Sequence, residues 1–289
     1  MALFYVFARY RFPLVPVLML LAAGGVLEAL DRARHRQSKG LAVAAAVAVL
    51  AVALAHLPLH DAKRSRAPHF LGIALALAKE PAHAEEAKGF YRRVLDLEPE
   101  FPPAQLGLGV ILTQQGRPEE AIPYFQAAVA SWPDYAEARY DLGLALAATG
   151  RWQEAAREYT EALRSSRDDA DTHIALGKAL TVMNRPDLAL EHYQRGLTLR
   201  PKDVKGLVGL GVVYTQMGRA DEAIRAYRLA LETDPQDVAA NNNLGWTLAS
   251  TGRIAEAMTY FERALAIDPN YENARNNLAQ ARRMLGLVP

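Results

Sequence analysis

The pattern of apolar and polar residues divides this chain into two parts. The first part contains two apolar runs, residues 12–30 and 41–59, and each is close to the roughly 20 residues that a helix needs to cross a bilayer. From about residue 69 onward the chain instead consists of short segments that end at Gly, Asn or Pro. The pattern predicts an all-α protein in which two transmembrane helices precede a domain of short helices.

The second part repeats with a period of 34 residues. A Leu-Gly pair recurs five times in register, followed at fixed distances by an alanine, an aromatic residue and a closing residue that is proline in every unit except one. A period of this length indicates two-helix hairpins that bury their apolar faces only by stacking on their neighbours. The pairs begin at Leu108, Leu142, Leu176, Leu210 and Leu244; the alanines are Ala121, Ala155, Ala189, Ala223 and Ala257; the aromatic residues are Phe125, Tyr159, Tyr193, Tyr227 and Phe261; the closing residues are Pro133, Arg167, Pro201, Pro235 and Pro269.

Residues at the ends of the expected helices support the same division. The Gly of each pair and the alanine on the second helix are small, so the two helices can approach closely, and the aromatic residue fills the gap between hairpins. Gly and Asn between the helices tolerate the left-handed conformation that ends a helix. Aspartates before three first helices are expected to be N-caps, and two prolines stand where a second helix begins. These residues are Gly116, Gly150, Asn184, Gly218 and Gly252; Asp169, Asp203 and Asp237; and Pro118 and Pro186.

The pattern resembles the tetratricopeptide repeat (TPR), and the resemblance implies a right-handed superhelical solenoid. One period upstream, Ala87, Tyr91 and Pro99 keep the register but Ala74-Leu75 replaces Leu-Gly, which predicts a degenerate first repeat. Leu278-Ala279 stands in the Leu-Gly register of a final lone helix. The expected boundaries are an N-terminal segment 1–11, transmembrane helices 12–30 and 41–59, a basic loop 31–40, a linker 60–68, a degenerate repeat 69–101, repeats 102–135, 136–169, 170–203, 204–237 and 238–271, and a capping helix 272–286.

The charges beside the apolar runs predict the membrane topology. The loop between the runs carries Arg32, Arg34, Arg36 and Lys39, and positive loops favour the cytoplasmic side. This places the repeats outside the cytoplasm, although basic residues before the first run and after the second favour the inverse arrangement, with cytoplasmic repeats. A cleaved signal peptide is the alternative for the first run. The abundance of Arg and Ala suggests a bacterial source, so we expect an inner-membrane protein with periplasmic repeats.

A second resemblance concerns residues 8–16, with the sequence ARYRFPLVP. This segment is similar to one near the C-terminal end of multi-pass glycosyltransferases that use lipid-phosphate sugar donors, including protein O-mannosyltransferase-like proteins. Several of these carry TPR repeats after their last spans. The resemblance implies a detached or truncated tail that presents acceptor proteins to a separate membrane glycosyltransferase.

The sequence offers little for catalysis. It contains no cysteine, which excludes disulfides and thiolate chemistry, and no phosphate-binding Gly-rich loop. His56 and His60 have a spacing that a metal could use, but Pro58 between them disturbs the helix. Residues 1–67 carry nine Lys and Arg against three Asp and Glu, while the whole chain has a net charge of +1, so the repeats are mildly acidic. We therefore expect no enzyme activity, no cofactor, no metal and no nucleic-acid partner.

A protein partner is expected in the groove of the solenoid. The TPR resemblance implies that the first helix of each hairpin lines the concave face. The exposed positions of these helices are mostly apolar or neutral, which argues against a clamp for a terminal carboxylate. The candidate groove residues are Leu106, Val110, Tyr140, Leu144, Ile174, Lys178, Val208, Val212, Asn242, Asn243, Trp246, Asn276 and Asn277.

Asparagines gather at the C-terminal end of this set. Asn241, Asn242 and Asn243 are consecutive although Asn is a poor helix former, and an amide can pair with both the N–H and the C=O of an extended peptide. The alternative is structural, since Asn before Leu-Gly is common in TPR sequences. Trp246 favours binding, because aromatic anchors concentrate interface energy. The leading hypothesis is a membrane-anchored scaffold that binds extended protein segments.

Overall fold

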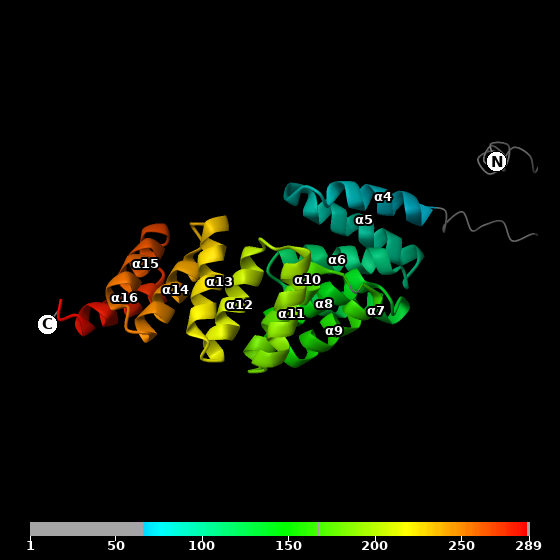
Figure 1. Ribbon diagram of the computed structural model, residues 1–289. Helices are drawn as coiled ribbons and strands as arrows, with labels where there is room; N and C mark the ends of the chain where they lie inside the picture. Colours follow the sequence, from blue (N-terminus) through cyan, green and yellow to red (C-terminus); the bar gives the residue numbers. More distant parts are fainter. Residues whose placement is uncertain (1–65, 167, 288–289) are drawn as a thin grey trace, which may run out of the picture. The chain divides into compact units, whose positions relative to one another are not determined.

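The computed structural model describes residues 66–166 and 168–287, and within these ranges all regular elements are helices. The chain divides into two compact units, Met1–Arg66 and Ala67–Pro289, and the second unit holds all the described helices (Figure 1). The all-α prediction is confirmed. The helices are α4 (Ala67–Leu77), the short 3₁₀ helix η2 (Pro81–His83), α5 (Ala84–Leu97), α6 (Pro102–Gln114), α7 (Pro118–Ser131), α8 (Ala136–Ala148), α9 (Trp152–Ser165), α10 (Ala170–Val182), α11 (Pro186–Leu199), α12 (Val204–Gln216), α13 (Ala220–Thr233), α14 (Val238–Ser250), α15 (Ile254–Ile267) and α16 (Glu272–Met284).

The helices form a stack of hairpins. Each first helix packs on its own second helix, and each second helix contacts the first helix of the next hairpin (Figure 1). The first helices α6, α8, α10, α12, α14 and α16 also contact one another in sequence, so they share one surface of the solenoid.

The predicted membrane-spanning runs 12–30 and 41–59 lie outside the described residues, as do the segment 8–16 and the pair His56 and His60. Among the helices in the described ranges, none combines the length and the apolar character that crossing a bilayer requires.

Close packing of glycine against an aromatic ring explains the Leu-Gly pairs. A Cβ atom added to Gly143 would lie 2.4 Å from Tyr159 Cε1, and one added to Gly109 would lie 2.5 Å from Phe125 Cε1. In each case the ring belongs to the second helix of the same hairpin and is fully buried. Only glycine lets the two helices approach this closely, which confirms the role predicted for it.

The glycines immediately before two of the Leu-Gly pairs meet the neighbouring hairpin. A Cβ atom on Gly107 would lie 2.3 Å from Tyr91 Cζ, and one on Gly209 would lie 2.3 Å from Tyr193 Cε1. Both rings belong to the preceding hairpin. We call this place the pre-Leu position; it is occupied by Gly107, Asp141, Ala175, Gly209, Asn243 and Asn277.

The predicted helix ends are confirmed. Gly116, Gly150, Asn184, Gly218 and Gly252 all have positive φ, and Asn184 is the one residue other than glycine with positive φ in the described part of the chain. The predicted caps also form: the carboxylates accept hydrogen bonds from backbone N–H groups three residues on, which would otherwise lack partners. These bonds join Asp169 to Thr172 N (2.9 Å), Asp203 to Gly206 N (2.8 Å) and Asp237 to Ala240 N (2.6 Å).

The first hairpin differs from the others in the way its first helix packs. Ala74 is fully buried whereas Leu75, which occupies the place of the glycine, is 50% exposed. Ala74 therefore packs inward as Leu108, Leu142 and Leu244 do at the equivalent place, whereas Leu75 leaves half of its surface exposed.

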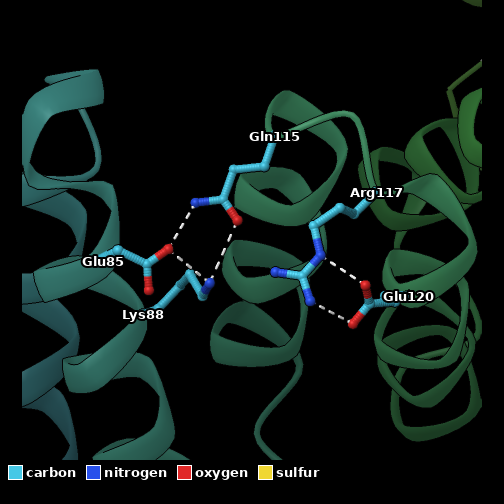
Figure 2. A network of polar contacts seen from close by, with 5 residues as sticks. All are labelled: Glu85, Lys88, Gln115, Arg117 and Glu120. Carbon is cyan, nitrogen blue, oxygen red and sulfur yellow. Dashed lines mark hydrogen bonds and ion pairs between the residues drawn. The ribbon is translucent and has the colours of Figure 1, made fainter.

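A polar network around the buried Lys88 joins this hairpin to the next (Figure 2). Lys88 is only 4% exposed, and its Nζ donates hydrogen bonds to Glu85 Oε1 at 2.8 Å and to Gln115 Oε1 at 3.3 Å. Gln115 Nε2 in turn donates to Glu85 Oε1 at 2.8 Å. Since a buried ammonium needs such partners, Lys88 ties α5 to the end of α6. The adjacent Arg117–Glu120 pair is bidentate and lies at the start of α7 (Figure 2).

Candidate functional site

The predicted groove residues differ in how far they reach the surface. Leu144, Lys178, Trp246 and Asn276 are exposed; Val110, Tyr140, Val208, Val212, Asn243 and Asn277 are half-buried; Leu106, Ile174 and Asn242 are buried. The exposed and half-buried residues reach solvent at least in part, although Val110, Tyr140, Val208 and Val212 also pack against the core.

Leu106 and Ile174 require correction, because their side chains belong to the hydrophobic core. Ile174 fills space left by two glycines: a Cβ atom on Gly196 would lie 2.8 Å from Ile174 Cγ1, and one on Gly206 would lie 3.2 Å from Ile174 Cδ1. Most other hairpins carry alanine in place of Gly196, so this enlarged gap is particular to the α10–α11 hairpin. Ile174 therefore stabilises the stack and does not meet a partner.

A hollow of about 230 Å³ lies at the C-terminal end of the same surface. The helix α14 contributes Trp246, whose side chain is 49% exposed, and α16 contributes Asn277 from the predicted set. The lining is mostly apolar with a few polar groups, which is the usual composition of a ligand site. The complete lining is Trp246, Ala249, Ser250, Phe261, Asn277, Gln280, Ala281 and Met284.

The residues Ser250 and Met284 were not among the predicted site residues. Ser250 lies four residues after Trp246, and Met284 lies four residues after Gln280, so helical spacing places each on the same face as a lining residue. That spacing could have identified them. It could not show that the two helices enclose a hollow.

The asparagines form a short ladder across α14 and α16. Asn277 Nδ2 donates to Asn242 Oδ1 at 3.0 Å, and Asn242 Nδ2 donates to Asn243 Oδ1 at 3.2 Å. The prediction that Asn242 meets a partner is corrected, because it is buried and holds its two neighbours in place. These two bonds use Asn243 Oδ1 and Asn277 Nδ2 and do not involve Asn243 Nδ2 or Asn277 Oδ1.

Asn241 has a structural role. Its Nδ2 donates to Pro235 O at 3.1 Å, and Gln105 and Arg139 donate in the same way to the carbonyls of Pro99 and Pro133, six residues before them. An amide or guanidinium at this place supplies a donor to the carbonyl of the closing proline, and that explains the first of the three consecutive asparagines.

Asp141 is an exceptional occupant of the pre-Leu position. Burial, with a smaller contribution from Glu137, raises the pKa of the Asp141 carboxyl to about 6. Neighbouring Tyr140 has its pKa raised to about 12 by burial and by several aspartates, Asp171 foremost. At neutral pH the Asp141 carboxylate is therefore charged in a place where burial disfavours the charge. The pre-Leu positions of α14 and α16 carry the neutral residues Asn243 and Asn277.

Replacing Asp141 with asparagine should stabilise the protein at neutral pH. The folded-state pKa of about 6 exceeds the ordinary 3.8, so the free energy of unfolding falls as the pH rises through this interval and stays lower above it. We expect Asp141→Asn to gain about 1–3 kcal/mol near pH 7.5 and almost nothing near pH 4. Thermal unfolding at the two pH values measures this. Asp134→Asn, at an exposed turn, is the matched control; an equal gain from both variants would contradict the prediction.

The described residues contain no cluster of three or more His, Cys, Asp or Glu side chains that could hold a metal ion. Stacked helical hairpins define a helical repeat protein, and this one has a mostly apolar hollow at the C-terminal end of its first helices. A family model described as tetratricopeptide repeat matches residues 83–136, 106–170, 174–238 and 208–272, which together make up more than half of the chain. The chain belongs to the tetratricopeptide repeat family.

Solved structures agree in fold. YrrB, described as a TPR protein with an unusual peptide-binding site, is 24% identical with a TM-score of 0.54, and the match covers 64% of this chain and 96% of that one. PilF of Pseudomonas aeruginosa is 18% identical with a TM-score of 0.65 and coverages of 76% and 100%. A repeat protein of Parabacteroides merdae is 15% identical with a TM-score of 0.65 and coverages of 77% and 88%. No curated protein sequence matches the chain. At these identities the likeness concerns the fold alone.

Proposed function

We propose that this protein is a non-catalytic, membrane-anchored scaffold that binds an extended segment of a partner protein on its first-helix surface. The observation that carries the proposal is the hollow beside Trp246, which Asn277 also lines, with Asn243 one helical turn before Trp246 on α14. A half-exposed tryptophan supplies a large apolar contact, and asparagine amides suit the N–H and C=O groups of a strand-like peptide.

Two features favour a peptide over a small molecule. The hollow is open to the shared surface of the first helices, along which Leu144, Val208 and Val212 offer further apolar contacts. The description of YrrB names a peptide-binding site on a protein of the same fold. An extended chain can use the hollow and this surface together.

The anchor is proposed from the sequence. Residues 12–30 and 41–59 would cross the bacterial inner membrane, and the basic loop 31–40 would be cytoplasmic, so the repeats would be periplasmic. Because the chain lacks cysteine, single cysteines give a direct test. Ser38→Cys lies in the loop, and Ser166→Cys lies at the exposed end of α9.

In intact cells, a membrane-impermeant thiol reagent that passes the outer membrane is expected to label position 166 and leave position 38 unlabelled. Both positions should react after lysis. Labelling of position 38 alone would place the repeats in the cytoplasm and refute a periplasmic function.

A second candidate function, as the tail of a glycosyltransferase-like system, rests only on residues 8–16. Co-purification of a stoichiometric multi-pass glycosyltransferase in mild detergent would support it.

A further inference from the structure

The two ends of the solenoid have opposite chemical character. The last helix, α16, is rich in Asn and Arg, and its exposed residues include Arg275, Arg282 and Arg283, as expected for an end that faces water. The first helix of the described part of the chain, α4, has the sequence APHFLGIALAL and contains no Asp, Glu, Lys or Arg. A terminal helix of this composition lacks the polar outer face that a repeat protein needs in water. Something apolar should therefore cover it.

The exposed residues of α4 are small or apolar except for one histidine. They are Pro68, His69, Gly72, Leu75 and Ala76. Leu75 occupies the place of the glycine of the Leu-Gly pairs and is 50% exposed. Half-buried Ile73 extends the apolar surface toward the end of the stack, because it occupies the pre-Leu position of a hairpin that has none before it among the described residues.

Positive charge borders this surface. No Asp or Glu occurs from residue 62 to residue 79, while Lys63, Arg64, Arg66 and Lys79 occur there. Arg66 and Lys79 are exposed at the two ends of α4. Burial of apolar area and attraction of basic residues to anionic lipids are the two contributions that hold a segment in the headgroup region of a bilayer, and α4 with its flanks offers both.

We infer that the exposed side of α4, the Leu75 surface, lies in the interfacial region of an anionic lipid bilayer. The inference rests on the proposed anchor: residue 59 ends the second expected span, and the seven residues 60–66 reach at most about 25 Å when extended. The helix α4 therefore begins near the membrane surface. Lipid is a better occupant than the chain's own second span, because residues 41–59 carry no acidic group to complement the basic flanks.

A fluorescent label tests this on the full chain. Leu75→Cys carrying an environment-sensitive dye is reconstituted into vesicles that contain phosphatidylglycerol and a lipid-borne quencher. The matched control is Leu229→Cys on α13, where the leucine is also exposed. We expect lipid quenching of roughly half or more of the emission at position 75 and less than about a tenth at position 229, with weaker quenching at position 75 in neutral vesicles.

Flotation of the same vesicles shows whether the chain is anchored in the membrane at all. It therefore tests the proposed anchor separately from the inference that Leu75 meets lipid. If the chain floats but the label at position 75 is not quenched, the inference is wrong and the anchor stands. An emission shifted to the blue without lipid quenching would show that a protein segment covers Leu75, and it would also overturn the inference. If the chain does not float, the anchor fails and the inference fails with it. Circular dichroism checks that both labelled variants remain helical.

Discussion

Replacing Gly143 with alanine should lower the free energy of unfolding by about 2–3 kcal/mol, among the largest losses from adding one methyl group in this protein. The added Cβ atom would lie 2.4 Å from Cε1 and 2.7 Å from Cδ1 of Tyr159, a ring that is fully buried and cannot rotate away. The two helices of the hairpin would have to separate, and the stacking on both neighbouring hairpins would suffer. Thermal unfolding followed by circular dichroism measures the loss.

Two other glycines serve as controls for this substitution. An added Cβ atom on Gly177 would lie 3.1 Å from the nearest atoms of Tyr193, so Gly177→Ala should change stability little, because the tighter contact offsets the gain in helix propensity. No atom lies within 4 Å of a Cβ on Gly89, and Gly89→Ala should stabilise by about 0.5–1 kcal/mol. Equal melting temperatures for the Gly143 and Gly89 variants would refute the packing argument.

Replacing Trp246 with alanine should weaken peptide binding by about 30-fold or more without lowering the melting temperature. Truncation of an aromatic anchor commonly costs about 2 kcal/mol of binding energy, which corresponds to this factor. The fold should be preserved because half of the side chain already faces solvent. The probe is a set of peptides selected from a random display library on the full chain, with affinities measured by fluorescence anisotropy.

Trp132 provides the matched control for Trp246. It is equally exposed, at 50%, but it lies after α7 and stacks on Tyr135 with ring centroids 4.6 Å apart, away from the hollow. Trp132→Ala should leave the affinity unchanged. If both variants bind as tightly as the natural chain, the selected peptides do not use the hollow. If both lose affinity equally, the loss does not arise from the hollow.

Features governed by neighbouring residues could be predicted from the sequence. Asp169, Asp203 and Asp237 cap helices because a carboxylate needs only the N–H groups of the next turn. Gly116 and Asn184 end helices because their own backbone tolerates positive φ. The 34-residue period predicted a glycine and an aromatic ring in each of the five hairpins from α6–α7 to α14–α15, whereas the contact of the ring with the glycine of its own hairpin, as between Gly143 and Tyr159, came from the structure.

The candidate site was only partly predictable. Trp246 and Asn277 were identified because they occupy the exposed positions of first helices, and the structure brings both to one hollow. The same rule wrongly included Ile174, since its burial depends on glycines at positions 196 and 206 that belong to other helices. It also treated three consecutive asparagines alike, whereas Asn241 bonds to the preceding turn and Asn242 bonds to α16.

The sequence by itself determined the repeat and the ends of its helices, because these depend on residues close together in the chain or on an exact period. Tertiary structure alone decided that Leu75 faces outward, that Asn242 is buried and that α14 and α16 enclose a hollow. The physical reason is that each of these depends on the volume and hydrogen-bonding groups of side chains from a separate helix. A helical period places a residue on a face, and only the packed neighbour determines whether that face is covered.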